Sequence, residues 1–122
     1  MAPFVASMAL DPNANHVVQR FLENMRSADC QFIMDVACAQ CAQLSTHRHG
    51  CCVMYWCFER ASDKQCEELV ARIMEHALEF CEDPFGNYVI QHVLAKGTWQ
   101  HACMLARKLL GHIPRLACQK FR

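Results

Sequence analysis

Two pairs of side-chain amides are the residues of this chain best suited to bind a polar ligand. Asn15 and Gln19 stand four positions apart in the sequence, and so do Asn87 and Gln91. Residues with this spacing project side by side from one face of a helix. Because each amide carries both a donor and an acceptor, such a pair could hydrogen-bond a ligand. Taken alone, the same pairs would also fit an ordinary solvated helix face.

The two pairs belong to a repeat with a period of 36 residues and no gap. A fixed period of about 20 to 50 residues is the signature of a stacked-repeat architecture. A repeat that presents similar side chains in each unit can read a repeating ligand. The aligned columns are Asn15, Cys51 and Asn87; His16, Cys52 and Tyr88; Gln19, Tyr55 and Gln91; and the apolar Ile33, Leu69 and Leu105.

Each unit is predicted to contain a short helix, a turn, a second helix and a longer third helix. Proline pre-sets its own backbone angle and suits a helix start, so the Asp11-Pro and Asp83-Pro turns each begin a helix. Ser62 or Asp63 is a suitable N-cap for a third helix. The second helices are expected at about 15–25, 51–61 and 87–96, and the middle unit's third helix at about 64–80. In the first unit the predicted buried face holds Val17, Val18, Phe21, Leu22 and Met25.

The composition is that of one globular domain. The 122 residues carry a formal net charge of zero, and 53% of them are hydrophobic, which is enough to bury a core. The neutral charge argues against a nonspecific phosphate binder, which is normally strongly basic. The sequence has no secretory signal and no stretch near the roughly 20 apolar residues of a membrane helix. We therefore expect a cytoplasmic protein with no membrane partner.

Most of the ten cysteines share repeat columns with aliphatic residues, as Cys57 does with Val93. They are expected to be buried free thiols. Cys38 and Cys41, with the nearby histidines, suggest zinc, but their spacing matches no usual zinc module. No cofactor or metal is expected. Five glutamates are most simply the solvent face of a third helix, and without a nucleophile constellation we expect no enzyme. These glutamates are Glu67, Glu68, Glu75, Glu79 and Glu82.

Three segments in register resemble a known family. Asp11–Arg20, Ser45–Val53 and Asp83–His92 are similar to three consecutive repeats of a Pumilio/PUF RNA-binding domain, the fourth to sixth of the usual eight. The resemblance implies an all-α, right-handed α-solenoid with repeats at about 1–38, 39–74 and 75–117. A further repeat would start at 118–122. One more period after Asn87 falls just beyond Arg122, so we expect part of a longer array or a truncated product.

The resemblance also implies a site on the second helices. In this family, residues i and i+4 bind the edge of one base, and residue i+1 stacks between bases. The implied base-edge residues are Asn15, Gln19, Cys51, Tyr55, Asn87 and Gln91. The implied stacking residues are His16, Cys52 and Tyr88. Residues with an auxiliary RNA contact would be Arg20, Trp56 and His92.

The implied function is sequence-selective binding of single-stranded mRNA in 3′ untranslated regions, as in post-transcriptional regulators. The first and third units should each prefer uracil. The middle unit departs from the family, because Cys51 matches an adenine reader but Tyr55 stands where a glutamine is expected. Two alternatives stay open. The chain could be a degenerate scaffold that binds protein partners through its aromatic or convex surface, which Tyr55 and Trp56 favour, or a truncated product that binds no RNA.

Overall fold

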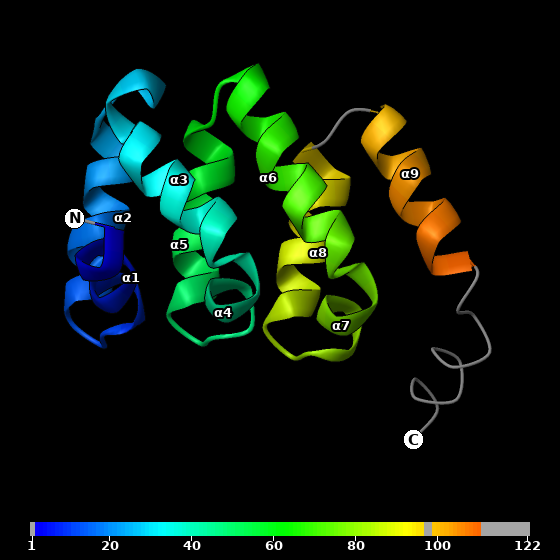
Figure 1. The fold of residues 1–122 in the computed structure, drawn as a ribbon, viewed down its shortest axis with the longest axis horizontal. Coiled ribbons are helices and arrows are strands. Elements are labelled where there is room, and N and C mark those ends of the chain that lie inside the picture. Colours follow the sequence, from blue (N-terminus) through cyan, green and yellow to red (C-terminus); the bar gives the residue numbers. More distant parts are fainter. Residues whose placement is uncertain (1, 97–98, 111–122) are drawn as a thin grey trace.

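The computed structural model describes residues 2–96 and 99–110, and all regular structure in those ranges is helical. The helices fall into two rows joined by shorter helices at the corners (Figure 1). The inner row consists of α2 (Ala14–Asn24), α5 (Gly50–Arg60) and α8 (Gly86–Lys96). The outer row consists of α3 (Gln31–Ala39), α6 (Asp63–Glu75) and α9 (Trp99–Leu110). The corner helices are α1 (Ala2–Leu10), α4 (Cys41–Ser45) and α7 (Ala77–Glu82), and a 3₁₀ turn, η1 (Ser27–Cys30), precedes α3.

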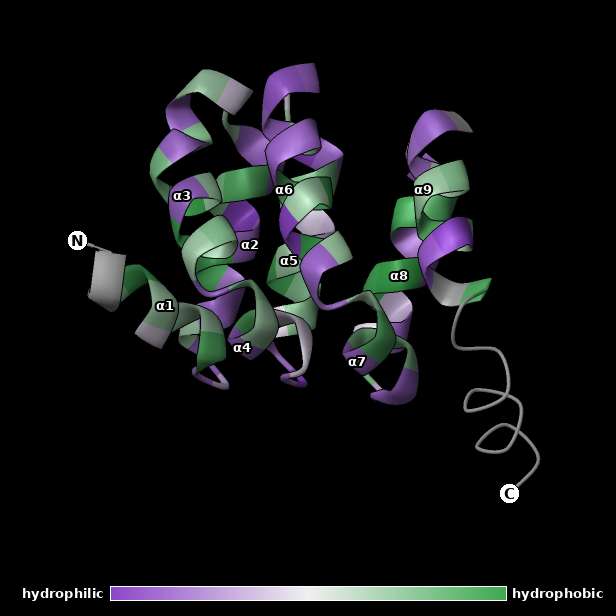
Figure 2. Ribbon diagram, turned by 45° about the vertical axis from the view of Figure 1, so that its right-hand side comes forward, coloured by the Kyte–Doolittle hydropathy of each residue, from purple (hydrophilic) through white to green (hydrophobic). Residues whose placement is uncertain are grey.

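The hydrophobic core runs along the molecule between the two rows. Leu22, Met54 and Val93 from the inner row and Leu69 and Ile73 from the outer row are all buried. Helices such as α3, α6 and α9 carry both hydrophobic and hydrophilic residues, as Figure 2 shows. Stacked units of this kind share one continuous core, and each unit depends on its neighbours. The predicted all-α solenoid is therefore confirmed.

The cysteines lie largely where the repeat predicted. Cys30, Cys41 and Cys57 are buried, and the nine cysteines of the described ranges are free thiols. Burial raises the pKa of the Cys57 thiol and raises that of Cys41 to about 11. Cys118 and the predicted further repeat at 118–122 lie outside the described residues, as does the end of the third repeat.

The predicted third helix of the middle unit was wrong at its C-terminal end. It does not run on to Phe80. Instead α6 ends at Glu75, and α7 begins at Ala77 after a break at His76, whose φ and ψ are −117° and 18°. The break turns the chain so that Ala77 and Phe80 enter the core. Gln40, one period earlier, breaks the chain in the same way.

The buried face predicted for α2, the second helix of the first unit, was also wrong at two positions. Val18 and Leu22 are buried, but Val17 is 60% exposed and Met25 is 42% exposed. The counterparts of Val17 in the next units, Val53 and Val89, are buried. These two lie on helices that follow another helix of the inner row, whereas no helix of that row precedes α2 within the described residues.

Two side chains of the middle unit bond to the unit before it. Arg60 donates from Nε to the Leu22 carbonyl at 2.7 Å and from its other guanidinium nitrogen to the Glu23 carbonyl, so it satisfies the end of α2. Gln65 is buried and donates from Nε2 to the Ser27 carbonyl at 3.0 Å and to Gln31 Oε1 at 2.7 Å. The Arg60 bonds join the adjacent inner helices α2 and α5, and the Gln65 bonds join α6 to η1 and α3 of the preceding unit.

The N-terminus of α6 is closed by Ser62, one of its two predicted caps. The Ser62 hydroxyl accepts from the Gln65 backbone N–H at 3.3 Å, and the Gln65 side chain accepts from the Ser62 N–H at 2.9 Å. This reciprocal pair is a capping box. Within the residues that the structure describes, no helix is both long enough and apolar enough to cross a membrane.

Candidate nucleic-acid interface

The start of each inner helix is fixed by one side chain in the turn before it. Asp11 Oδ2 accepts from the backbone N–H groups of Asn13 at 2.9 Å and Ala14 at 2.8 Å. Two repeats later, Asp83 Oδ2 likewise accepts from the backbone N–H groups of Phe85 and Gly86. The donated N–H groups, that of Ala14 above all, lower the pKa of Asp11. The carboxylates thereby satisfy backbone groups that a helix start leaves unpaired.

The middle unit uses a histidine for the same purpose. His47 Nδ1 accepts from the backbone N–H groups of His49 at 3.0 Å and Gly50 at 3.3 Å. The ring nitrogen must be unprotonated to accept these bonds. All three inner helices consequently begin at the same column of the repeat.

Two glycines let α5 and α8 approach the corner helices closely. A Cβ atom added to Gly86 would lie 2.8 Å from Phe80 Cα, and one added to Gly50 would lie 2.8 Å from Leu44 Cα. Both distances are far inside van der Waals contact. The absence of a side chain at these two positions lets the first turns of α5 and α8, which carry residues of the predicted site, pack against the corner helices.

The structure brings the first amide pair together. Gln19 donates from Nε2 to Asn15 Oδ1 at 2.7 Å. Asn15 is only 1% exposed, and its Nδ2 donates to the carbonyls of Asp11 at 2.7 Å and Pro12 at 3.0 Å. The amide of Asn15 is thus tied to the turn before α2, while Gln19 lies nearer the surface.

The second amide pair has the same geometry but is more open. Gln91 donates from Nε2 to Asn87 Oδ1 at 2.9 Å. Gln91 is exposed and Asn87 is half-buried. Tyr88, the predicted stacking residue beside them, is 63% exposed, and His16 in the first unit is exposed as well. Both units therefore present an amide pair next to an accessible flat ring.

The middle unit has no such pair. Cys51 is half-buried, and its Sγ donates to the Arg48 carbonyl at 3.4 Å. Tyr55 is 44% exposed. Its interaction with the Glu59 carboxylate, one turn further along α5, raises the pKa of Tyr55. The Cys51 thiol is thus bonded to the backbone and not to the side chain four residues further on.

An ion pair to the next unit completes the surroundings of Tyr55. Lys96 Nζ lies 2.6 Å from Glu59 Oε2. The hydrogen bond from Lys96 lowers the pKa of Glu59 and raises that of Lys96 itself. Neither residue was among the predicted site residues, although Glu59 follows Tyr55 at the i+4 spacing that couples residues on a helix face.

Two predicted auxiliary residues pack against Tyr55. The ring of His92 lies 4.5 Å from that of Tyr55, centroid to centroid, and burial lowers the pKa of His92. Its Nε2 is buried and has no hydrogen-bond partner among the described residues. Trp56 is half-buried and lies edge-on to Tyr55 at 5.5 Å. The third auxiliary residue, Arg20, is exposed and lies 3.9 Å from Glu23.

A hollow of about 430 Å³ opens beside these rings on the inner row. Its walls are the two thiols and four aromatic rings, and Gln19 and Arg48 stand at its polar edge. Cys52, the predicted stacking residue of this unit, is exposed there. Phe85 and Arg48 were not predicted as site residues, although both lie in the turns that start the inner helices. The walls are formed by Cys51, Cys52, Tyr55, Trp56, Phe85 and Tyr88.

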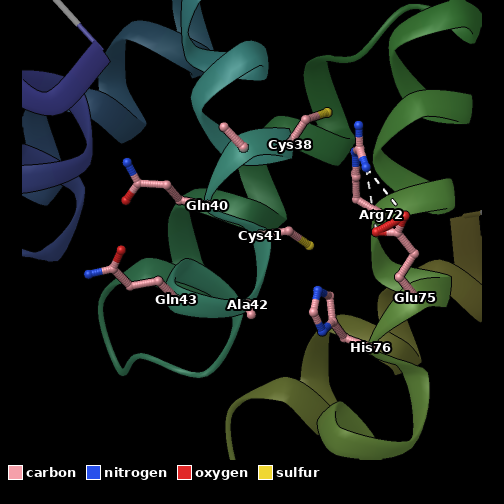
Figure 3. A pocket seen from close by; sticks show the side chains of 9 residues that line it. Cys38, Gln40, Cys41, Ala42, Gln43, Arg72, Glu75 and His76 are labelled. Atoms are coloured by element: carbon pink, nitrogen blue, oxygen red, sulfur yellow. Dashed lines mark hydrogen bonds and ion pairs between the residues drawn. The ribbon is translucent and has the colours of Figure 1, made fainter.

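A larger cavity lies on the other side of the molecule, between α3, α4 and α6. It has a volume of about 560 Å³ and includes Cys38, Cys41 and His76, with an Arg72–Glu75 ion pair of 3.3 Å at its wall (Figure 3). Cys41 is buried with its Sγ 3.9 Å from the Ser45 hydroxyl. The described residues contain no group of three or more histidine, cysteine or acidic side chains arranged to hold a metal ion.

The repeat matches a known family. The profile of the Pumilio-family RNA binding repeat, PUF, matches residues 4–36, 40–74 and 76–98. The chain belongs to this family. Its three PUF matches each contain one inner helix, so the amide pairs and the Cys51–Tyr55 unit occupy corresponding places in successive PUF repeats.

Relatives and solved structures agree with this assignment. A Pumilio domain-containing protein of Schizosaccharomyces pombe is 43% identical over 99% of this chain. The Puf4 RNA binding domain, bound to a 3′ UTR recognition sequence of HO endonuclease RNA, is 31% identical over 88% of this chain with a TM-score of 0.84. The RNA-binding domain of yeast Puf5p, bound to AAT2 RNA, is 27% identical over 97% of this chain with a TM-score of 0.87.

The chain is much shorter than the proteins it matches. It spans 18% of the length of the Schizosaccharomyces pombe relative. It also spans 35% of the Puf4 chain and 34% of the Puf5p chain.

Proposed function

We propose that this chain binds single-stranded RNA sequence-selectively along its inner row, with one base for each PUF unit. The observation that carries the proposal is the pair of matching amide clusters, Asn15 with Gln19 and Asn87 with Gln91, held in register on parallel helices. Each pair keeps unused donors and acceptors, which suit the edge of a base. The exposed rings of His16 and Tyr88 suit stacking on base faces.

The ligand is mRNA, and the proposed role is post-transcriptional regulation through 3′ untranslated regions. The solved relatives bound to RNA recognition sequences support this ligand class. The amide pairs of the first and third units are assigned to uracil. The proposed repeat boundaries are 1–38, 39–74 and 75–117. Binding proceeds without chemical change to the RNA, and the proposed location is the cytoplasm.

Three units alone should bind weakly. Stacking contributes about 1–3 kcal/mol for each base, whereas micromolar affinity requires about 8 kcal/mol. Binding is therefore measured by fluorescence anisotropy up to about 500 µM protein, a range that reaches sub-millimolar dissociation constants. The probes are short labelled RNAs that contain 5′-UNU-3′, with a scrambled RNA of the same composition.

The decisive variant is Gln91→Ala, because Gln91 is exposed and its removal leaves the fold intact. Loss of its edge contact should weaken binding to the UNU RNA by about five- to tenfold and leave the weaker binding to the scramble unchanged. The matched control is Gln43→Ala, which removes an exposed amide from α4, outside the inner row. Equal affinity of a folded protein for UNU and scrambled RNA would reject the proposal and favour the protein-scaffold alternative.

A further inference from the structure

We infer that the middle unit stacks on any of the four bases without discriminating among them. The ligand of this chain is then a trinucleotide with uracil at both ends and any base in the middle. The inference rests on the proposed function and specifies its ligand. It follows from the hydrogen bond of Cys51, from the ring contact of Tyr55 with the next unit, and from the residues that line the hollow beside them.

Both groups that could read a base edge in this unit are engaged within the protein. The Cys51 thiol donates to the Arg48 carbonyl, back toward the start of α5. The Tyr55 ring is packed against Trp56 of its own helix and His92 of the next unit, at 5.5 Å and 4.5 Å between ring centroids. In the flanking units the side chains at these columns bond to each other and stand as one amide cluster.

Tyr55 is held in this position from two sides. Its ring lies against His92 of the next unit at 4.5 Å, and Glu59, one turn further along α5, is paired with Lys96 of that same unit at 2.6 Å. Turning the phenol toward Cys51 would break the ring contact with His92. His92 is therefore a positioning residue for Tyr55.

The hollow beside Tyr55 nevertheless suits a flat ligand. Tyr88 stands on its far side, 63% exposed, and Trp56 and Phe85 complete aromatic walls. Aromatic walls hold a base through its faces, which all four bases share, so stacking is tolerant of sequence. Arg48, exposed at the edge, carries a charge suited to a phosphate, which is also the same in every nucleotide.

The experiment compares RNAs that contain UAU, UGU, UCU and UUU between identical flanks, by anisotropy. The wild-type chain should bind all four within about twofold, whereas replacing either outer uracil should cost about fivefold or more. Tyr88→Ala should weaken binding to all four by roughly tenfold, because it removes a stacking wall. Tyr55→Phe, which removes only the hydroxyl, should leave the four affinities equal.

A second variant tests whether the middle unit can be given a preference for one base. Tyr55→Gln places an amide four residues after Cys51, as in the flanking units, and should produce a preference of about fivefold for one middle base. Wild-type discrimination above about fivefold at the middle base, lost in Tyr55→Phe, would overturn the inference while leaving RNA binding established. Failure of the folded chain to prefer any of these RNAs over a scramble would overturn the proposed function and this inference with it.

Discussion

At the scale of single residues, two asparagines in one repeat column have different tasks. Asn15 bonds through Nδ2 to the Asp11 and Pro12 carbonyls and is 1% exposed, whereas Asn87 is half-buried. A buried polar group loses about 1–3 kcal/mol when its partner is removed. The first amide therefore supports the turn before α2, whereas the second is partly open to the surface.

This difference predicts that replacing the asparagine by alanine costs much more stability at position 15 than at position 87. Asn15→Ala should lower the free energy of unfolding by about 1–3 kcal/mol, because two buried carbonyl bonds are lost. Asn87→Ala, the matched control, should change it by less than about 0.5 kcal/mol. Urea unfolding followed by circular dichroism measures both. Equal losses at the two positions would mean that the Asn15 bonds contribute no stability.

The sequence predicted that the amides of the first and third units lie side by side, but not how the Tyr55 side chain packs. The i, i+4 spacing was enough to pair Asn15 with Gln19 and Asn87 with Gln91. The position of the Tyr55 ring depends on its contact with His92, which lies on the next helix of the row. No pattern within α5 contains that information, because it arises from packing between units.

At the scale of helices, the period placed the inner row well. The predicted second helices agree with α2, α5 and α8 to within a residue or so at each end. The break at His76 was missed because neither proline nor glycine marks it. The need to bury Ala77 and Phe80 sets it instead, and tertiary packing of this kind overrides local helix preference.

The glycine that starts α8 gives a prediction at this scale. Gly86→Ala should gain roughly 1 kcal/mol in helix propensity but lose more by pushing Phe80 away, for a net loss of about 1–2 kcal/mol. The added Cβ would lie 2.8 Å from Phe80 Cα. Ala14 occupies the same column of the first unit, so Ala14→Gly is the control.

That control should cost about 1 kcal/mol or less, from propensity alone. Thermal melts and urea titrations of both variants compare the two effects. A higher free energy of unfolding in Gly86→Ala would show that α7 and α8 move apart to accommodate the added Cβ atom without a loss of stability.

At the scale of the whole molecule, buried thiols make stability depend on pH. Burial raises the pKa of Cys41 to about 11 and raises that of Cys57 from its ordinary value of 9.0. Below that ordinary value, the thiols are protonated in both the folded and unfolded states. As pH rises through 9, the unfolded chain releases protons that the folded chain retains, so the folded state becomes less stable.

The free energy of unfolding should therefore fall above pH 9, by up to about 1.4 kcal/mol per pH unit for each such thiol. Urea unfolding between pH 7 and pH 10 under reducing conditions measures the slope. Cys57→Val is a suitable comparison, because Val93 fills the same column of the next unit. Its slope should be shallower, and an unchanged slope would exclude Cys57 as a source of the effect.

The bonds from Arg60 to the preceding unit have a consequence for protein engineering. Both acceptors, on Leu22 and Glu23, are backbone carbonyls, which every helix end provides whatever its side chains. An arginine at this column can thus join its unit to any predecessor of the same length. Units could be reordered or exchanged to assemble new ligand specificities without redesigning this part of the junction.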